Sequence, residues 1–138
     1  MNKTLLFLGL FLAGALLYPL IEVAVRGHSH WSMSLAGGLA LMSLYIVQVR
    51  LAGRSLRRRC LVGALLITGI ELIFGIIFNI YLGLNVWNYS NLPANFLGQI
   101  SPFFTLLWFL LCIPVFIALS KLQTILQQTQ VRRNAFQR

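Results

Sequence analysis

The third apolar stretch of the chain reads CLVGALLITGIELIFGIIFNIYL over residues 60–82. One charged side chain, Glu71, stands at its middle. A helix needs about 20 mostly apolar residues to cross the hydrocarbon layer of a bilayer, and an open strand edge in lipid would leave backbone groups without partners. The stretch therefore predicts a membrane-spanning helix.

Three further apolar stretches accompany this segment, at about residues 4–25, 31–49 and 102–119. The whole chain is 59% apolar and 9% charged, whereas roughly a quarter of the residues in an ordinary soluble domain are charged. A soluble chain of 138 residues cannot hide that much apolar surface. We therefore predict an all-α polytopic membrane protein with four transmembrane helices, in which residues 1–138 form a single membrane domain.

The positively charged residues indicate how the helices are oriented. All of the Lys and Arg residues except Arg26 lie before the first span, between the second and third spans, or after the fourth. They are Lys3, Arg50, Arg54, Arg57, Arg58, Arg59, Lys121, Arg132, Arg133 and Arg138. Because Lys and Arg collect in cytoplasmic loops, we predict a plasma (inner) membrane protein with both termini, the basic loop 50–59 and the tail 120–138 in the cytoplasm.

The segment between the third and fourth spans carries no charge. It reads GLNVWNYSNLPANFLGQIS over residues 83–101, and Trp87, Tyr89 and Phe96 alternate there with asparagine and glutamine. Aromatic rings with polar edges favour the headgroup layer of a membrane. We therefore predict an interfacial loop on the outer side.

Glu71 is the residue that most needs an explanation. It lies eleven residues from either end of its span, or about 16 Å from each surface at 1.5 Å per residue. An ionised carboxylate there costs at least ~2.5 kcal/mol, and no span core contains a Lys, Arg or His. We expect Glu71 to be protonated, hydrogen-bonded to a partner such as Tyr18, Ser43 or Thr105, or open to a water-filled cavity. It either binds a ligand or a proton, or it holds helices together.

Polar residues also gather at the outer end of the first span. Glu22 and Arg26 stand four apart on one helical face, which favours an ordinary ion pair; alternatively, Arg26 holds an anionic group of a ligand or lipid. His28 and His30 supply two zinc ligands at most, and no Asp or Cys lies on the outer side, so no metal site is predicted. Trp31 is expected to anchor the second span at the interface.

Several classes of function lack their usual signals. The chain has no GxxxxGK[ST] phosphate loop, no nucleophile elbow and no HExxH pattern. Cys60 and Cys112 have neither metal-ligand spacing nor a disulfide framework. The net charge of +9 comes from residues clustered between apolar runs, as topology signals are. We predict no cofactor, no metal ion and no nucleic-acid partner.

Two regions of the chain, residues 26–38 and 71–110, carry a family pattern. Its residues are Arg26-Gly27, Ser29-His30-Trp31-Ser32-Met33, Gly37-Gly38, Glu71, Gly75, Trp87-Asn88-Tyr89-Ser90, Leu92-Pro93, Asn95 and Gly98-Gln99-Ile100. With these residues in this order, the chain resembles the small membrane proteins of the CmpB-like type of ABC-transporter permease. The resemblance implies a polytopic, transport-linked protein, and its pattern has an Asp where this sequence has Asn88.

We therefore predict a transport-related or small-molecule-binding membrane protein with an outward-facing polar site. The residues expected to line or cap this site are Glu22, Arg26, His30, Glu71, Trp87, Asn88, Tyr89 and Asn95. Four helices barely enclose a pathway, so the expected partners are the lipid bilayer, a small-molecule ligand and a second copy or a larger membrane complex. Two alternatives stay open: a structural or regulatory protein acting through helix packing and partner docking, and, ranked last, a lipid-acting enzyme using Glu and His as acid and base.

Overall fold

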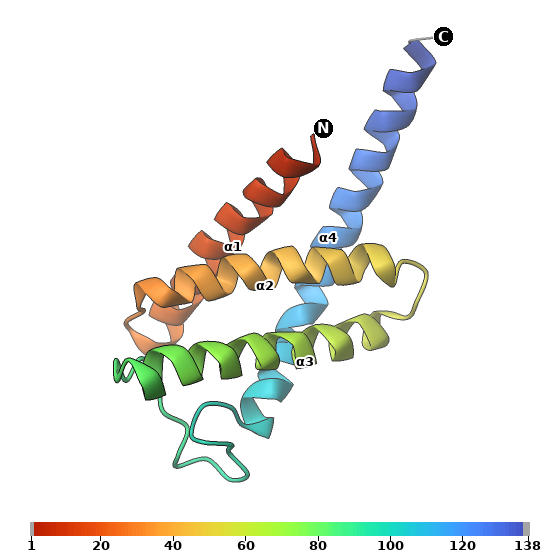
Figure 1. The fold of residues 1–138 in the computed structure, drawn as a ribbon. Helices are drawn as coiled ribbons and strands as arrows, with labels where there is room; N and C mark the ends of the chain where they lie inside the picture. The colour runs from red at the N-terminus through yellow and green to blue at the C-terminus, as the bar shows by residue number, and fades with distance from the viewer. Residues whose placement is uncertain (1, 137–138) are drawn as a thin grey trace.

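The computed structural model describes residues 2–136, which fold into four long helices (Figure 1). They are α1 (Lys3–Arg26), α2 (Trp31–Arg50), α3 (Leu56–Phe74) and α4 (Pro102–Phe136), and a seven-residue π-helix, η1 (Gly75–Tyr81), continues α3. With η1 counted as part of α3, each of the four is long and apolar enough to cross a membrane. The prediction of an all-α fold with four such helices is confirmed, and the chain is a multi-pass membrane protein.

Polar side chains fix where two of the helices begin. Ser55 Oγ accepts a hydrogen bond from the backbone N–H of Arg58 at 3.4 Å, which caps α3. His30 Nδ1 accepts from the backbone N–H of Ser32 at 3.3 Å, which caps α2. Each cap satisfies a backbone donor that has no partner inside its own helix.

The bundle has two chemically different ends (Figure 1). The basic end comprises the N-terminus of α1, the turn 51–55 between α2 and α3, and the C-terminal part of α4. The loop end comprises the turn 27–30 between α1 and α2 and the segment 82–101, which we call the cap. The arginines of 50–59 surround the basic-end turn, whereas the cap carries no charged side chain.

Close approaches at small residues hold the helices together in pairs, α1 with α2 and α3 with α4. Gly14 and Gly37 set backbone against backbone, because a Cβ added at Gly37 would come 2.5 Å from the Gly14 carbonyl oxygen. A Cβ added at Gly63 of α3 would come 2.9 Å from Cys112 Sγ of α4. Small residues allow such contact between helices in a membrane, and α2 packs on α3 to join the two pairs.

Buried apolar side chains form two clusters. The cluster toward the basic end contains Leu10, Leu44, Tyr45, Val47, Cys60, Ile67, Cys112, Phe116 and Leu119. The cluster toward the loop end contains Met33, Ala36, Phe74, Trp87 and Tyr89. A cavity lies between them, and residues of both clusters line it.

The cap folds back on the bundle and buries two of its three aromatic side chains. Trp87 and Tyr89 are 4% and 9% exposed because their rings pack among the helices, whereas Phe96 stays exposed. The backbone is left-handed at Gly83, Asn85, Ala94, Leu97 and Gly98. Residues other than glycine rarely adopt this conformation, so the tight turns of the cap depend on the contacts that its rings make with the helices.

Candidate functional site

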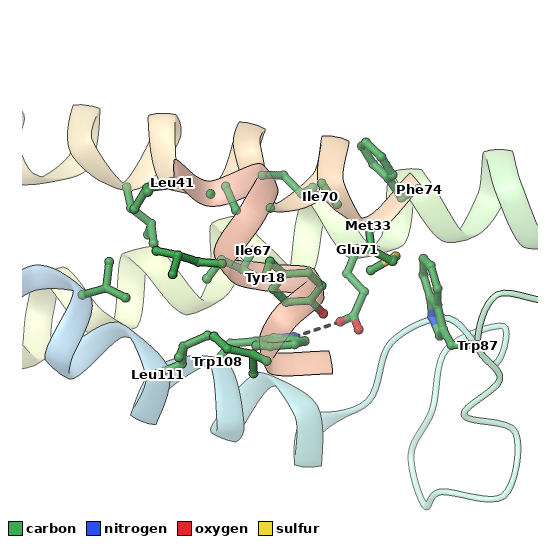
Figure 2. A pocket seen from close by; sticks show the side chains of 18 residues that line it. Tyr18, Met33, Leu41, Ile67, Ile70, Glu71, Phe74, Trp87, Trp108 and Leu111 are labelled. Atoms are coloured by element: carbon green, nitrogen blue, oxygen red, sulfur yellow. Dashed lines mark hydrogen bonds between the residues drawn. The ribbon is translucent and has the colours of Figure 1, made fainter. Parts of the chain in front are cut away.

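The cavity between the two clusters has a volume of about 130 Å³, and Figure 2 shows the side chains that line it. All four helices and the cap contribute to its wall, which includes the aromatic rings of Tyr18, Phe74, Trp87 and Trp108. Glu71 is the only charged residue among its lining residues. An apolar cavity of similar size holds one benzene molecule, so this space fits a single small group of a ligand.

Glu71 is 7% exposed, and both of its carboxylate oxygens are hydrogen-bonded. Oε1 accepts from the Tyr89 hydroxyl at 2.7 Å, and Oε2 accepts from Trp108 Nε1 at 3.0 Å. The Tyr18 hydroxyl points toward the same carboxyl group (Figure 2). Within residues 2–136, no Lys or Arg forms an ion pair with Glu71, so neutral donors alone hold the acid.

Tyr89 joins the cap to α4 as well as to Glu71. Its ring stacks on Phe104 with the centroids 4.1 Å apart and the planes 12° from parallel. Burial, and then the neighbouring Glu71 carboxylate, raises the pKa of Tyr89 well above its ordinary range. The phenol therefore stays protonated at neutral pH and can donate its hydrogen bond to Glu71.

One side of the cavity reaches the outer face of α1. Leu17 and Ile21 line the cavity, yet they are 56% and 43% exposed. The opening therefore lies beside these two side chains of α1. This helix is long and apolar enough to cross a membrane.

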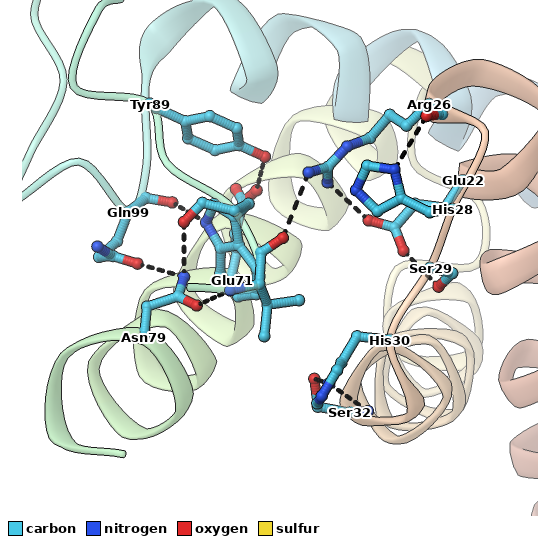
Figure 3. Close-up of polar contacts among 12 residues, drawn as sticks. Glu22, Arg26, His28, Ser29, His30, Ser32, Glu71, Asn79, Tyr89 and Gln99 are labelled. Carbon is cyan, nitrogen blue, oxygen red and sulfur yellow. Dashed lines mark hydrogen bonds and ion pairs between the residues drawn. The ribbon is translucent and has the colours of Figure 1, made fainter. Parts of the chain in front are cut away.

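Asn79 of η1 fastens the cap to the bundle (Figure 3). Its Oδ1 accepts from the Val86 N–H at 2.6 Å, and its Nδ2 donates to the Trp87 carbonyl at 3.0 Å and to Gln99 Oε1 at 2.8 Å. Gln99 fits there because Gly75 has no side chain. A Cβ added at Gly75 would come 2.6 Å from Gln99 Oε1. The buried side-chain amide of Asn79 thus binds the cap near its beginning, at Val86 and Trp87, and near its end, at Gln99, and holds it over the cavity.

Glu22 and Arg26 form the ion pair that their spacing favours, with Glu22 Oε1 and Arg26 Nη1 2.9 Å apart (Figure 3). Ser29 Oγ donates to the other carboxylate oxygen of Glu22 at 2.6 Å. Arg26 Nη2 also donates to the Val86 carbonyl at 3.3 Å. This network ties the end of α1 to the cap beside the cavity.

Of the eight predicted site residues, Glu71 and Trp87 line the cavity, whereas six do not: Glu22, Arg26, Tyr89, His30, Asn88 and Asn95. The ring of His30 caps α2, and its Nδ1 lies 2.8 Å from Ser32 Oγ. Asn88 is exposed, and its Oδ1 accepts from the backbone N–H of Ser90 at 2.8 Å. Asn95 Nδ2 donates to a backbone carbonyl within the cap at 2.8 Å. These side chains shape the backbone, and the Asp that the family pattern has at position 88 could accept the same hydrogen bond.

Sequence reasoning missed two partners of the site, Trp108 and Gln99. A tryptophan within a span needs an acceptor for its N–H. The sequence could therefore have indicated that Trp108 donates a hydrogen bond to an acceptor such as Glu71. No sequence pattern indicated that Gln99 would contact Asn79, because the position of Gln99 depends on the fold of the cap. Of the partners expected for Glu71, Thr105 instead pairs with Thr68, 2.9 Å away across α3 and α4.

The chemistry of the site is that of a binding pocket with one acid. Within residues 2–136, no group of three or more His, Cys, Asp or Glu side chains could hold a metal ion. The groups around Glu71 are the phenols of Tyr18 and Tyr89, the indoles of Trp87 and Trp108, and apolar side chains. This set can bind a cation or exchange a proton.

Residues 12–136 match the family model described as "Putative ABC-transporter type IV". The chain belongs to this family. The match covers the whole of the cavity and the cap, so both lie in the part of the chain that corresponds to the family. Among curated proteins and among solved structures, none matches the chain.

Proposed function

We propose that the protein is the small-molecule-binding membrane component of a transport system and that it takes the positively charged end of an amphipathic molecule into the cavity at Glu71. One observation carries this proposal. Glu71 is the only charged residue that lines an otherwise apolar cavity.

Charge supports a cationic ligand. A buried carboxyl group either takes up a proton or is stabilised as a carboxylate by hydrogen bonds and an opposite charge; within residues 2–136, Glu71 has the hydrogen bonds but no ion-pair partner. Arg26 already pairs with Glu22. A cation in the cavity would complete the environment of Glu71, and the faces of Tyr18, Trp87 and Trp108 would add cation–π attraction.

Access supports an amphipathic ligand rather than a strongly hydrated one. The cavity opens beside Leu17 and Ile21, which are exposed on α1. In a bilayer this face of a spanning helix meets hydrocarbon. A molecule already dissolved in the membrane reaches the cavity there without crossing the hydrogen-bonded cap.

The proposal includes an orientation, with the basic end in the cytoplasm and the cap and cavity toward the outside of the plasma (inner) membrane. Single cysteines at Asn91 in the cap and at Arg54 in the basic-end turn test it with a membrane-impermeant maleimide on intact cells. Cys60 and Cys112 are fully buried, which keeps the background low. We expect labelling of Asn91→Cys alone; labelling of Arg54→Cys from outside would reverse the orientation.

Binding is measured with benzyltrimethylammonium and its uncharged isostere neopentylbenzene, through the fluorescence of Trp87 and Trp108 in a Trp31→Phe background. Trp31 is 61% exposed and does not line the cavity. We expect the cation to bind at least tenfold more tightly than the isostere, a difference of about 1.4 kcal/mol. Glu71→Gln should remove this preference.

Glu22→Gln is the matched control, because Glu22 is also a buried acid but lies outside the cavity. It should leave the preference for the cation intact. Equal binding of the cation and its isostere to the unaltered protein would contradict the proposal.

A second candidate function is structural, and one observation favours it. Both oxygens of Glu71 already have donors, and these donors connect α3 to α4 and to the cap. If Glu71→Gln leaves cation binding and cation flux into liposomes unchanged but lowers the fraction of dimers, the role of Glu71 is helix packing.

A further inference from the structure

A second hollow lies at the basic end, between α2 and α3. This cleft has a volume of about 400 Å³. Arg50 and Arg58 line it toward the turn, and Ile46, Val62 and Leu66 line it toward the middle of the helices. From Arg58 to Leu66 the cleft follows α3 for eight residues, or about 12 Å.

The two arginines of this cleft lack an acidic partner. The chain has only two acidic side chains; Glu22 pairs with Arg26, and Glu71 lines the cavity. Within residues 2–136, the guanidinium groups of Arg50 and Arg58 make neither an ion pair nor a hydrogen bond. The negative charge that complements them must come from another molecule.

We propose that this cleft binds an anionic phospholipid, with its phosphate between Arg50 and Arg58 and an acyl chain along Ile46, Val62 and Leu66. The cleft is charged at one end and apolar along the remainder, which is the polarity of a phospholipid in a leaflet. Basic pockets between membrane-spanning helices bind lipid headgroups in this way. A free phosphate would satisfy the arginines but leave the apolar groove unfilled.

Neighbouring arginines provide an internal control. Arg54 and Arg57 belong to the same basic segment and, like Arg50 and Arg58, are exposed, but they do not line the cleft. If the lipid were attracted by the general positive charge of this end, all four arginines would contribute alike. If it sits in the cleft, Arg50 and Arg58 contribute far more.

The test is native mass spectrometry of the full chain in detergent, titrated with phosphatidylglycerol or with phosphatidylcholine of the same acyl chains. We expect retention of phosphatidylglycerol over phosphatidylcholine, and a roughly 30-fold loss of that preference in Arg50→Gln/Arg58→Gln. Arg54→Gln/Arg57→Gln should change it by less than about threefold. An equal loss in both double variants would overturn the proposal.

Two further arms separate the lipid from its headgroup. Val62→Trp fills the groove while leaving every charge in place, and it should lower phosphatidylglycerol retention; unchanged retention would overturn a seat in the groove. Inorganic phosphate in large excess should fail to displace the lipid. Displacement by phosphate alone would mean that the cleft holds a free anion.

Discussion

Glu71 near the loop end and Arg59 near the basic end are both charges held inside the helix bundle by neutral partners. Glu71 receives hydrogen bonds from a phenol and an indole. Arg59 Nη1 donates to Gln48 Oε1 at 2.6 Å and to Ser120 Oγ at 3.0 Å. Among residues 2–136 neither charge has an oppositely charged partner.

Glu71 and Arg59 differ in whether empty volume lies beside the charged group. Glu71 lines the cavity of about 130 Å³, whereas the guanidinium of Arg59 lies 5.9 Å above the ring centroid of Phe116 and does not line either hollow. Its Nε has no hydrogen-bond partner within the described part of the chain. The half-buried charge of Arg59 joins helices, whereas the empty volume beside Glu71 supports the binding site that we propose there.

The largest effect is expected from Asn79→Leu, which should free the cap without disturbing the basic end. It removes three hydrogen bonds, to Val86, Trp87 and Gln99, and should lower the free energy of unfolding in mixed micelles by about 3 kcal/mol. Protease cleavage within residues 83–101 should rise in parallel. Asn91→Leu, at an exposed position of the cap, should leave both measurements unchanged; equal sensitivity of the two variants would contradict the role of Asn79.

Gly75→Ala should separate the cap from η1 by steric contact alone. The added methyl group would come 2.6 Å from Gln99 Oε1 and 2.8 Å from its Cβ, which should cost about 2 kcal/mol. Gly69→Ala on α3 meets nothing within 4 Å and should stabilise the helix slightly. If both substitutions stabilise the protein, Gln99 does not pack against Gly75.

Arg59→Met should weaken the basic end by about 1.5 kcal/mol while leaving cation binding at Glu71 intact. The apolar stem is kept, but Gln48 and Ser120 lose their shared donor. Arg57→Met, a change at an exposed neighbour, should have almost no effect on unfolding. Loss of cation binding in Arg59→Met would show that the two ends are coupled.

Tyr89→Phe should have the smallest effect at neutral pH, about 1 kcal/mol for one lost hydrogen bond. The substitution should also change how the folding stability depends on pH in alkaline solution. Because the pKa of Tyr89 is raised in the folded protein, the unfolded chain loses that proton first above about pH 10, and folding stability falls by up to about 1.4 kcal/mol per pH unit.

Tyr89→Phe should remove this share of the alkaline loss, whereas Tyr81→Phe, at an 84% exposed position, should retain it. Identical slopes of stability against pH in both variants would place the Tyr89 hydroxyl away from Glu71.

The helices were predictable because the evidence for them is local. Apolar runs of spanning length predict helices in lipid wherever they occur, and the spacing of Glu22 and Arg26 was sufficient to favour their ion pair. The isolation of Glu71 within its span also identified it as the residue whose surroundings matter most.

The partners of Glu71 could not be read in the same way. Tyr89 and Trp108 are 18 and 37 residues away along the chain, and the backbone between Glu71 and Tyr89 passes through a left-handed, non-glycine position at Asn85. The sequence analysis placed Trp87 and Tyr89 both in an interfacial loop and among the residues that line or cap the site, because a ring with a polar edge suits either the interface or a hydrogen-bonded interior position. Only the tertiary fold distinguishes the two.

The wide turns of η1 position Asn79, which makes three of the hydrogen bonds that attach the cap. A π-helix closes its hydrogen bonds over five residues instead of four, as though one residue were inserted into an α-helix. Deleting Ile80, which follows Asn79, should let this segment tighten into an ordinary helix and rotate Asn79 by roughly 90°. The span would remain long enough to cross the bilayer, but the amide would turn away from Val86 and Trp87. Changes of length at this point are therefore expected to alter what the molecule recognises while preserving its insertion into the membrane.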